Sequence, residues 1–375
     1  MRIGIVGCGY VSALYLRTLQ RRPDLQISGV ADLEPERRRI LAAHAKCPAF
    51  ESVEELVEKS RVDIVVNLTN PSSHYAVNRA ALLAGKHVYC EKPLATDFSQ
   101  AKELVELAKH LGLQLSGAPC NVLSEVAQAV WREVRRKTVG VSRLAYAELD
   151  DGMIHRAPYQ RWLNEFGIPW PAKDEFEVGC TLEHAGYYLT WLAAFFGPAD
   201  TVTRFGTTTI PDKCGVEGLH TISPDFTVAC IRFHSGMTAR LTCSIVAEHD
   251  HRLRIMGDEG ELSVHDCWDY RSRAGIRKLM RIRRRSMLSP WTIPIRLPPP
   301  PTGRLTRFGS ATMDFASGVA ELADAIRSGR TSRLSPEFCL HTNELALAIH
   351  AADRDPGCYK VTTRFAPMEP MPWTW

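Results

Sequence analysis

The residues best suited to chemistry stand at the end of a short apolar strand, in His87–Pro93 (HVYCEKP). His87–Cys90 is predicted to form a buried strand, and Glu91-Lys92-Pro93 follows it directly. In an open parallel sheet, ligands bind beyond the carboxyl ends of the strands, so a lysine and a glutamate stand where two ligands could meet. Pro93 restricts the backbone of Lys92 and so fixes where its side chain points. Taken alone, the motif also fits a solvated loop, because lysines and glutamates usually lie on the surface.

A glycine-rich turn near the start of the chain has the pattern of a phosphate-binding turn. A predicted strand over 2–6 leads into Gly7–Ser12 (GCGYVS), and a predicted helix follows. Gly7 permits the tight turn, and Gly9 lets the backbone approach a pyrophosphate at the helix N-terminus. Because Ser12 replaces the third glycine of the dinucleotide fingerprint, the motif alone is weak evidence.

The next predicted strand strengthens the interpretation of that turn. It covers Leu25–Ala31 and ends at Asp32, where an acid accepts the ribose hydroxyls of a bound adenosine. The same carboxylate could instead cap the helix predicted over 35–45. Asp32 would repel a 2′-phosphate, and Leu33 beside it offers no positive charge. We therefore expect NAD as the cofactor, with NADP as the alternative.

Strands and amphipathic helices alternate through the first third of the chain. Strands are predicted over 63–68, 87–90 and 114–117, with helices over 72–84 and 97–110. This alternation predicts an α/β fold with a doubly wound parallel sheet of the Rossmann type, over residues 1–120.

Residues 121–375 have a different pattern, with several strands between Thr201 and His265 and no helix among them. Tight turns at 234–237 and 257–260 predict consecutive hairpins. We expect a second α/β domain with a large, mainly antiparallel open sheet. Its helices are predicted over 121–137, 180–196, 313–328 and 336–352.

One segment of the second domain is strongly basic. Arg271–Arg307 holds 11 Lys or Arg and no acid, and it includes Pro294 and Pro298–Pro301. We expect a proline-rich loop that is solvated or contacts another subunit. The alternative is that its arginines bind an anionic substrate such as a nucleotide sugar. Because the rest of the chain is net negative, a nucleic-acid binder is not expected.

The composition is that of a soluble globular protein, with 45% hydrophobic and 23% charged residues. No apolar run approaches the roughly 20 residues that span a bilayer, so no membrane partner is expected. The 11 cysteines are odd in number and form no CxxC pair. They indicate reduced thiols and a cytoplasmic location.

With these motifs identified, the chain resembles the glucose–fructose oxidoreductase / inositol dehydrogenase / MocA (Gfo/Idh/MocA) family over most of its length. The resemblance rests on five segments: GCGYVS (7–12), TNPSSH (69–74), EKP (91–93), VGCTLEHAGYYLTW (178–191) and MDFASGVAELADAI (313–326). It implies NAD(P)-dependent hydride transfer at a carbinol or carbonyl carbon of a sugar, sugar derivative, nucleotide sugar or cyclitol. It also implies a homo-oligomer, dimer or tetramer, formed through the open sheet.

The resemblance assigns roles to individual residues. Lys92 would hydrogen-bond the reacting oxygen, and His184 would be the acid/base. Asn121 would lie near the nicotinamide or substrate, and a cis peptide is expected at Lys92-Pro93. The cofactor would be bound by Gly7, Gly9, Tyr10, Val11, Ser12, Asp32, Thr69, Asn70, Pro71, His74, Glu91 and Asn121.

One position departs from the family pattern. The family commonly has an aspartate four residues before the histidine, where this chain has Cys180, which we place on the substrate side of the same helical face. A thiol cannot replace the carboxylate that orients the histidine. Glu177 and Glu183 are candidates for that role.

Other residues could shape a sugar pocket, and Trp162 is the one we assign to it. Trp170, Lys173 and Tyr188 are further candidates, although all four could equally be packing residues. The sequence His249-Asp250-His251 resembles a metal-binding motif. It joins two strands without an evident third ligand, so we interpret it as a loop and expect no metal.

Two other functions remain open from the sequence. Some relatives use transient nicotinamide redox chemistry to cleave glycosides or to eliminate, without net oxidation. A non-catalytic NAD(H) sensor would keep the glycine turn but would not require Lys92 and His184, so their presence argues against it.

Overall fold

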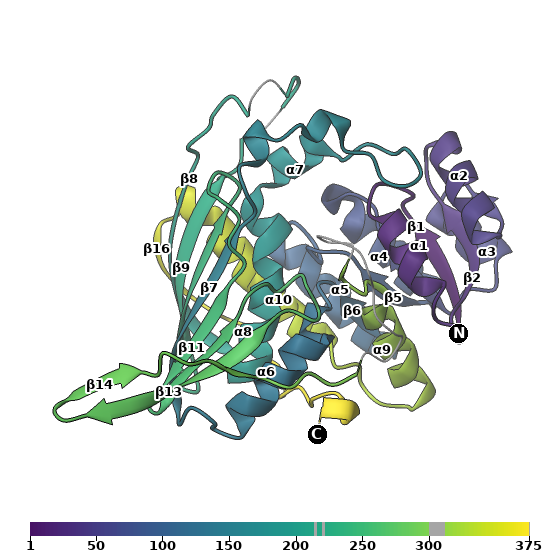
Figure 1. Ribbon diagram of the computed structural model, residues 1–375. Helices are drawn as coiled ribbons and strands as arrows, with labels where there is room; N and C mark the ends of the chain where they lie inside the picture. Colours follow the sequence, from purple (N-terminus) through teal and green to yellow (C-terminus); the bar gives the residue numbers. More distant parts are fainter. Residues whose placement is uncertain (214–215, 220–221, 300–311, 375) are drawn as a thin grey trace.

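The computed structural model describes residues 1–374 except 214–215, 220–221 and 300–311. Two sheets lie at opposite ends of the molecule, and helices fill the space between them (Figure 1). The smaller sheet belongs to the N-terminal part of the chain, and the larger one to the C-terminal part.

The first sheet is parallel throughout, in the order β3-β2-β1-β4-β5-β6. This strand order is that of a Rossmann fold, in which the crevice opens where the order reverses, beyond β1 and β4. The strands are β1 (Arg2–Val6), β2 (Gln26–Ala31), β3 (Ala49–Phe50), β4 (Ile64–Asn67), β5 (His87–Cys90) and β6 (Leu115–Gly117). The helices are α1 (Ser12–Leu19), α2 (Pro35–Ala45), α3 (Val53–Lys59), α4 (His74–Leu83) and α5 (Phe98–His110).

The second sheet has ten strands, in the order β14-β13-β12-β11-β7-β10-β9-β8-β16, with β15 beside β13. Its neighbours are antiparallel except β7 and β10, which run parallel. The strands are β7 (Ser142–Asp150), β8 (Ala199–Thr207), β9 (Phe226–Phe233), β10 (Thr238–Ser244), β11 (Leu253–Gly257), β12 (Gly260–Val264), β13 (Ala274–Ile282), β14 (Arg285–Leu288), β15 (Ile293–Pro294) and β16 (Gly357–Lys360). The two sheets confirm the fold class predicted from the sequence.

Two predicted helices are interrupted. The helix expected over 121–137 starts only after Ser124, whose hydroxyl accepts the amide of Ala127 and caps the N-terminus. The helix expected over 180–196 opens as a π-helical segment, Thr181–Ala185, and continues as α8. The remaining helices are α6 (Glu125–Arg135), α7 (Ala172–Val178), α8 (Gly186–Phe196), α9 (Ala316–Arg327) and α10 (Pro336–His350).

The prediction of a loop over 271–307 was wrong for most of the described part of that segment. β13 and β14 form a hairpin whose two-residue turn contains Arg283 in the left-handed region, with φ of 55°. The hairpin projects from the edge of the large sheet (Figure 1). β13 also pairs with β12, but most side chains of β13 and β14 are exposed or half-buried, so no continuous buried face marks these strands in the sequence. Residues 300–307 lie outside the described residues.

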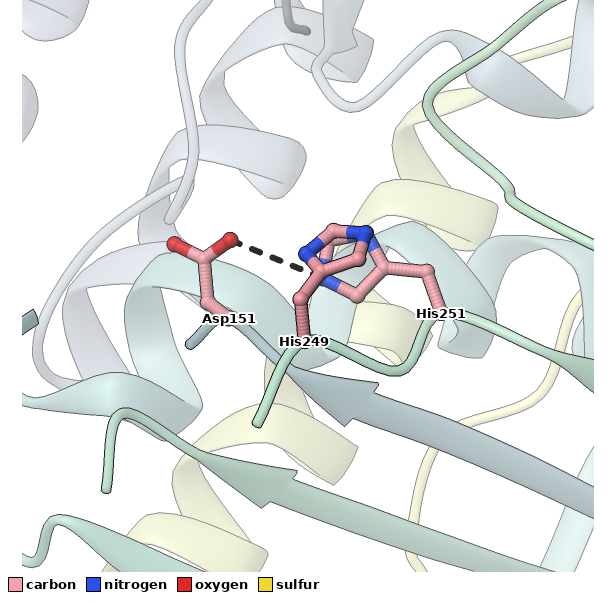
Figure 2. A group of neighbouring side chains, drawn as sticks. All are labelled: Asp151, His249 and His251. Atoms are coloured by element: carbon pink, nitrogen blue, oxygen red, sulfur yellow. Dashed lines mark ion pairs between the residues drawn. The ribbon is translucent and has the colours of Figure 1, made fainter. Parts of the chain in front are cut away.

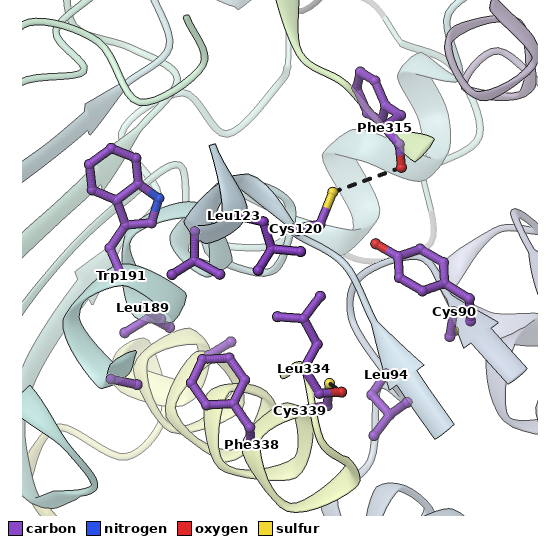
Figure 3. Packing of buried hydrophobic residues seen from close by; sticks show 14 of the residues in the cluster. Cys90, Leu94, Cys120, Leu123, Leu189, Trp191, Phe315, Leu334, Phe338 and Cys339 are labelled. Carbon is purple, nitrogen blue, oxygen red and sulfur yellow. Dashed lines mark hydrogen bonds between the residues drawn. The ribbon is translucent and has the colours of Figure 1, made fainter. Parts of the chain in front are cut away.

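Helices from the end of the chain bind the two sheets together. Asp314, just before α9, forms an ion pair of 2.5 Å with Arg22 at the end of α1. The hydroxyl of Ser116 in β6 donates to Leu334 O, just before α10, at 2.7 Å. Figure 3 shows the packing here, where Phe338 and Cys339 of α10 lie between residues from both parts of the chain. A domain division after residue 120 stays a prediction, because these C-terminal helices pack on the first sheet.

The helices of the described residues include none long and apolar enough to cross a bilayer. The ten cysteines in that part of the chain are all free thiols, and most are buried.

Candidate active site

Lys92 lies at the carboxyl end of β5, as the sequence predicts. The Lys92-Pro93 peptide is cis, which confirms the expectation from the family. Glu91 beside it is buried, and its two oxygens accept from the Tyr15 hydroxyl at 2.6 Å and from the Lys92 amide at 3.1 Å. Tyr15 belongs to α1, so the glutamate joins this loop to the helix that follows the glycine turn.

The Lys92 ammonium forms an ion pair with Glu183, which lies in the π-helical segment of the second domain. Glu183 is 6% exposed and Lys92 21% exposed at the side chain, so this ion pair is largely shielded from water. Burial alone would lower the pKa of Lys92, but the Glu183 carboxylate and other nearby acids raise it above its usual value. Lys92 is therefore a permanent cation and hydrogen-bond donor at neutral pH, and not a base.

His184 is buried next to Glu183, and its Nε2 lies 3.4 Å from Asp151 Oδ2. Burial, together with the charges of Lys92 and His251, lowers the pKa of His184 well below its usual value. The imidazole is thus neutral at neutral pH. Its Nδ1 is buried without a hydrogen-bond partner among the described residues, so one ring nitrogen faces a carboxylate and the other is free.

Asp151 is the carboxylate that the sequence analysis missed. Neither Glu177 nor Glu183 serves His184 as we expected, because Glu183 pairs with Lys92 and Asp151 occupies the position facing Nε2. Burial raises the pKa of Asp151 to about 7. Asp151 follows β7 directly, and its position at a strand end was the signal that could have identified it.

The thiol of Cys180 does not take the place of the missing carboxylate. Cys180 is 1% exposed, and its sulfur donates to the carbonyls of Pro224 at 3.3 Å and Cys243 at 3.5 Å. These contacts pack the side chain on the large sheet. The substrate contact we expected for Cys180 is not among them.

Two histidines of the β10–β11 connection gather around Asp151 (Figure 2). The C-terminal end of β7 lies beside the residues that precede β11, because Asp150 and Asp250 form a β-bridge. β12, which is followed by Asp266, pairs with β11. His251 Nε2 lies 3.5 Å from Asp151 Oδ1, and His251 Nδ1 lies 3.4 Å from Asp266 Oδ1. We name the set Asp151, His249, His251 and Asp266 the strand-end cluster.

The glycine turn fits a dinucleotide. Gly7 has φ of 95°, and a Cβ there would lie 2.5 Å from the Leu68 carbonyl carbon, so only glycine is accommodated. A Cβ on Gly9 would meet no described atom within 4 Å, so its backbone faces open space. Helix α1 begins beyond this space with no side-chain cap at its N-terminus. Backbone amides are thus available where a pyrophosphate would bind.

Asp32 lies at the end of β2 and belongs to the same turn. Its two oxygens accept from the amides of Cys8 at 2.6 Å and Glu34 at 2.8 Å. The amide of Cys8 ties the acid to the glycine turn, as an adenosine-ribose acceptor requires. It does not act as the cap of α2, whose N-cap residue is Glu34.

The TNPSSH segment lies beside this crevice. His74 is fully buried between the carbonyl oxygens of Pro93, at 2.6 Å, and Thr69, at 2.9 Å, so it joins this segment to the Lys92 loop. Asn70 and Pro71 line a pocket that Glu177 and Leu182 complete from the second domain.

A loop of the second domain covers the remaining turn residues. The Asn164 side chain donates to the Tyr10 carbonyl at 3.0 Å, and Phe166 stacks on His44 of α2 with ring centroids 4.4 Å apart. Ser12 is turned inward, because its hydroxyl donates to Gly9 O at 2.7 Å. Val11 is the N-cap residue of α1.

The remaining site candidates are held mainly by the protein itself. The Asn121 amide donates to the carbonyls of Tyr187 and Cys267. Trp162 packs edge-on against Trp170 at 5.2 Å between ring centroids. A contact of either with substrate stays a prediction.

Two further candidates for the sugar pocket have different surroundings. Tyr188 is fully buried and bonds the His251 carbonyl, which is a packing role. Lys173 is exposed.

Comparison with known proteins decides the family. The model of an oxidoreductase family with an NAD-binding Rossmann fold matches residues 1–118, and the Gfo/Idh/MocA C-terminal domain model matches residues 152–263. The chain belongs to the Gfo/Idh/MocA family. It is an oxidoreductase with an NAD-binding Rossmann domain.

Curated relatives in this family are dehydrogenases. The chain is 27% identical to trans-1,2-dihydrobenzene-1,2-diol dehydrogenase of Macaca fascicularis over 275 residues, which are 72% of this chain and 75% of that protein. It is 28% identical to UDP-N-acetylglucosamine 3-dehydrogenase of Acidithiobacillus ferrooxidans over 265 residues, 70% of this chain and 74% of that one.

Solved structures share the fold at low sequence identity. An NAD-binding oxidoreductase from Klebsiella pneumoniae superposes with a TM-score of 0.77 at 20% identity, covering 96% of this chain and 99% of that one. A dehydrogenase from Bordetella pertussis, in complex with NADH and UDP-GlcNAcA, gives 0.71 at 17% identity and covers 96% and 98%.

The ion pair between the domains gives a test of the site. Glu183→Gln removes the charge that holds Lys92, so kcat should fall on the order of 10- to 100-fold, because small misplacements of a reacting group are that costly. NAD affinity should not change. Glu106→Gln, which removes an exposed carboxylate 3.8 Å from the Lys102 ammonium on α5, should retain wild-type kcat.

Glu183→Gln should lower kcat little further in a protein that already carries Lys92→Ala. A steady-state kinetic double-mutant cycle measures this coupling. Additive losses in kcat would contradict a positioning role for Glu183.

Proposed function

We propose that the protein is an NAD-dependent dehydrogenase that oxidises a secondary alcohol of a sugar, sugar derivative, nucleotide sugar or cyclitol, or reduces the matching ketone. The observation that carries the proposal is the pairing of a buried, permanent cation with a buried, neutral base. Lys92 is held by Glu183, and His184 keeps one buried ring nitrogen without a hydrogen-bond partner in the described structure. The dehydrogenase activities of the curated relatives support it.

Lys92 acts on the reacting oxygen. As an ammonium it donates a hydrogen bond to the hydroxyl oxygen and stabilises the negative charge that develops there as the alcohol is oxidised. Glu183 holds the cation at the start of the reaction, so little reorganisation is required when the charge appears. Gly7, Gly9 and Asp32 would hold NAD, which would supply the hydride acceptor for oxidation of the carbinol carbon.

His184 receives the hydroxyl proton. With Nε2–H directed at Asp151, the lone pair of Nδ1 is the available acceptor. Asp151 then stabilises the imidazolium that forms. The lowered pKa of His184 keeps the base unprotonated at neutral pH, before the reaction begins.

The cofactor is assigned to the first domain through Gly7, Gly9 and Asp32, with Glu91 next to the reacting end. The two ends of the dinucleotide would thus be held by groups at the carboxyl ends of β1, β2 and β5 in one sheet. The substrate would approach from the second domain, which supplies His184 and the aromatic loop around Trp162.

The lysine gives the first test of this function. Lys92→Ala should lower kcat on the order of 100-fold or more, because it removes stabilisation of the developing alkoxide. NAD affinity should be unchanged, since the glycine turn lies on other strands. NADH formation with a panel of sugars, nucleotide sugars, cyclitols and dihydrodiols provides the assay, and a variant with wild-type kcat would exclude Lys92 as the catalytic cation.

The same panel separates the open alternatives. Substrate cleavage without net NADH would indicate transient redox chemistry, and NAD binding without turnover of any compound would indicate a sensor.

Cofactor preference is a second prediction. Asp32 stands at the ribose position, and Leu33 beside it is 83% exposed and uncharged. The guanidinium of Arg38 lies nearby, but it already donates to the carbonyls of Asp32 and Leu33 and to Glu51, so the Asp32 carboxylate would repel a 2′-phosphate without a free arginine to offset it. Fluorescence titration should show NAD(H) binding more tightly than NADP(H). Asp32→Ser should reduce the difference in affinity between NAD(H) and NADP(H). Tighter binding of NADP(H) than of NAD(H) by the wild type would contradict the preference for NAD.

We also propose a cytoplasmic homo-oligomer, a dimer or tetramer, that forms through the open sheet. The β13–β14 hairpin and the following residues expose large apolar side chains, an unusual cost for a surface that faces only water. Their exposed fractions are 42% for Leu279, 53% for Ile282, 50% for Met287 and 74% for Trp291.

The apolar side chains of this hairpin predict the assembly state. Trp291→Glu should shift the protein to smaller species in size-exclusion chromatography with light scattering. Leu83→Glu, at a similarly exposed apolar residue on α4, should leave the mass unchanged. A monomeric wild type, or equal behaviour of both variants, would contradict an interface at this hairpin.

A further inference from the structure

We propose that the strand-end cluster is a binding site for a divalent transition-metal ion of the zinc class, with Asp151, His249 and His251 as ligands. The sequence led us to expect no metal, because the two histidines lacked a third ligand. The fold supplies it: Asp151 follows β7, and the histidines precede β11, at the same edge of the sheet. One ligand atom from each of the three residues lies within 4.8 Å of the other two.

The separation between His251 Nε2 and Asp151 Oδ1 is compatible with two ligands of one metal ion. His251 Nε2 and Asp151 Oδ1 are 3.5 Å apart, which is beyond the usual range for a hydrogen bond between such groups. Two nitrogen or oxygen ligands of a tetrahedral zinc, each bonded at about 2.0–2.2 Å, lie about 3.4 Å apart. The observed separation matches that edge of a tetrahedron.

His251 provides an independent observation. It is 1% exposed, and neither of its ring nitrogens has a hydrogen-bond partner among the described residues. A buried polar atom without a partner is costly, and Nδ1 faces the Asp266 carboxylate, so Nε2 is the nitrogen that points to a ligand. A cation between Nε2 and Asp151 satisfies it directly.

Asp266 completes the arrangement from the other side of His251. Its Oδ1 lies 3.4 Å from His251 Nδ1, so it can accept the Nδ1–H proton and leave Nε2 as the ligand. Its position is itself fixed, because Oδ1 also accepts the Trp268 amide at 2.8 Å. Carboxylates hold metal-binding histidines in this way at many zinc sites. His251, Asp266 and Cys267 are also close enough to form a group of three metal ligands. In that group the Asp266 carboxylate already accepts a hydrogen bond from the Trp268 amide.

The remaining ligand, His249, is half exposed, and its Nε2 lies 3.8 Å from Asp266 Oδ2. Its ring lies 4.0 Å from that of His251, measured between centroids (Figure 2). Two histidines and one carboxylate leave at least one coordination position open, the arrangement of catalytic rather than structural zinc. Asp151 uses Oδ1 toward this site and Oδ2 toward His184, so the ion would lie one carboxylate away from the proposed base. If the proposed function holds, a substrate oxygen could occupy the open position.

Metal binding by the full-length protein tests the proposal without any turnover. After chelator treatment and dialysis, calorimetric titration with Zn²⁺ alone should give one site per chain, and zinc should raise the melting temperature. Co²⁺ in place of Zn²⁺ should give the visible absorption bands of a four- or five-coordinate ion. No saturable binding to the wild type would overturn the proposal.

Three variants locate the site. Asp266→Asn should weaken binding by about 10- to 100-fold, as the loss of an orienting partner does, and His249→Gln should weaken it further. His234→Asn is the matched control, because His234 also faces a carboxylate, Asp200 at 3.6 Å, but belongs to no candidate ligand group of the described residues. It should bind zinc like the wild type.

NAD affinity and circular dichroism report whether each variant is folded. Equal zinc affinity of His249→Gln and the wild type would reject these ligands. A wild type that binds no ion, with His249→Gln altering only the pH profile, would make the cluster a proton path and reject the metal site. The zinc titration involves no substrate, so absence of zinc binding would not affect the test of Lys92→Ala. In the same way, a wild-type kcat of Lys92→Ala would not affect the test of zinc binding.

Discussion

The ion pair between Lys92 and Glu183 is the contact on which the site depends, because it joins the loop after β5 to the π-helical segment beside the large sheet. Lys92 is fixed by β5 and its cis-proline loop, and Glu183 by the π-helical segment against the large sheet. Neither charge could be buried alone, since an isolated buried ion is far more costly than a paired one. Docking of the domains and assembly of the active site are therefore one event. The helices α9 and α10, which pack on the first sheet, hold the domains at the separation that the pair requires.

Much of the first domain follows from local sequence. The glycine turn, the helix after it and the strand His87–Cys90 all lie where predicted, because each depends on residues that are neighbours in the chain. Lys92 and Asp32 could be assigned for the same reason. The partner of His184 could not be, because Asp151 and His184 lie in different elements and meet only when β7 takes its place in the large sheet. The candidates from the sequence were the carboxylates nearest to His184 along the chain. The carboxylate that faces His184 in the fold is farther away in the sequence.

The basic segment shows the opposite error, in which composition obscured a regular structure. Its arginines and prolines suggested a loop, whereas β13 and β14 extend the sheet edge into a hairpin that stands in solvent. Most of the hairpin is exposed at the end of the sheet, so it tolerates charged side chains that a buried central strand would exclude. The pattern of apolar and polar residues predicts strands that bury at least one face. It gives little information about strands whose two faces are both exposed to solvent.

The π-helical turn at Thr181–Ala185 has a consequence for how this protein is compared with its relatives. Such a turn holds about one residue more than an α-helical turn, so the chain before it is rotated relative to α8. Because α8 is anchored in the core, loss of a single residue here would turn Glu183 by about 100° away from Lys92. The number of residues in this turn is thus as much a part of the active site as their identity. A sequence alignment that opens a one-residue gap in this segment would match the wrong side chains to His184 and to the position of Cys180.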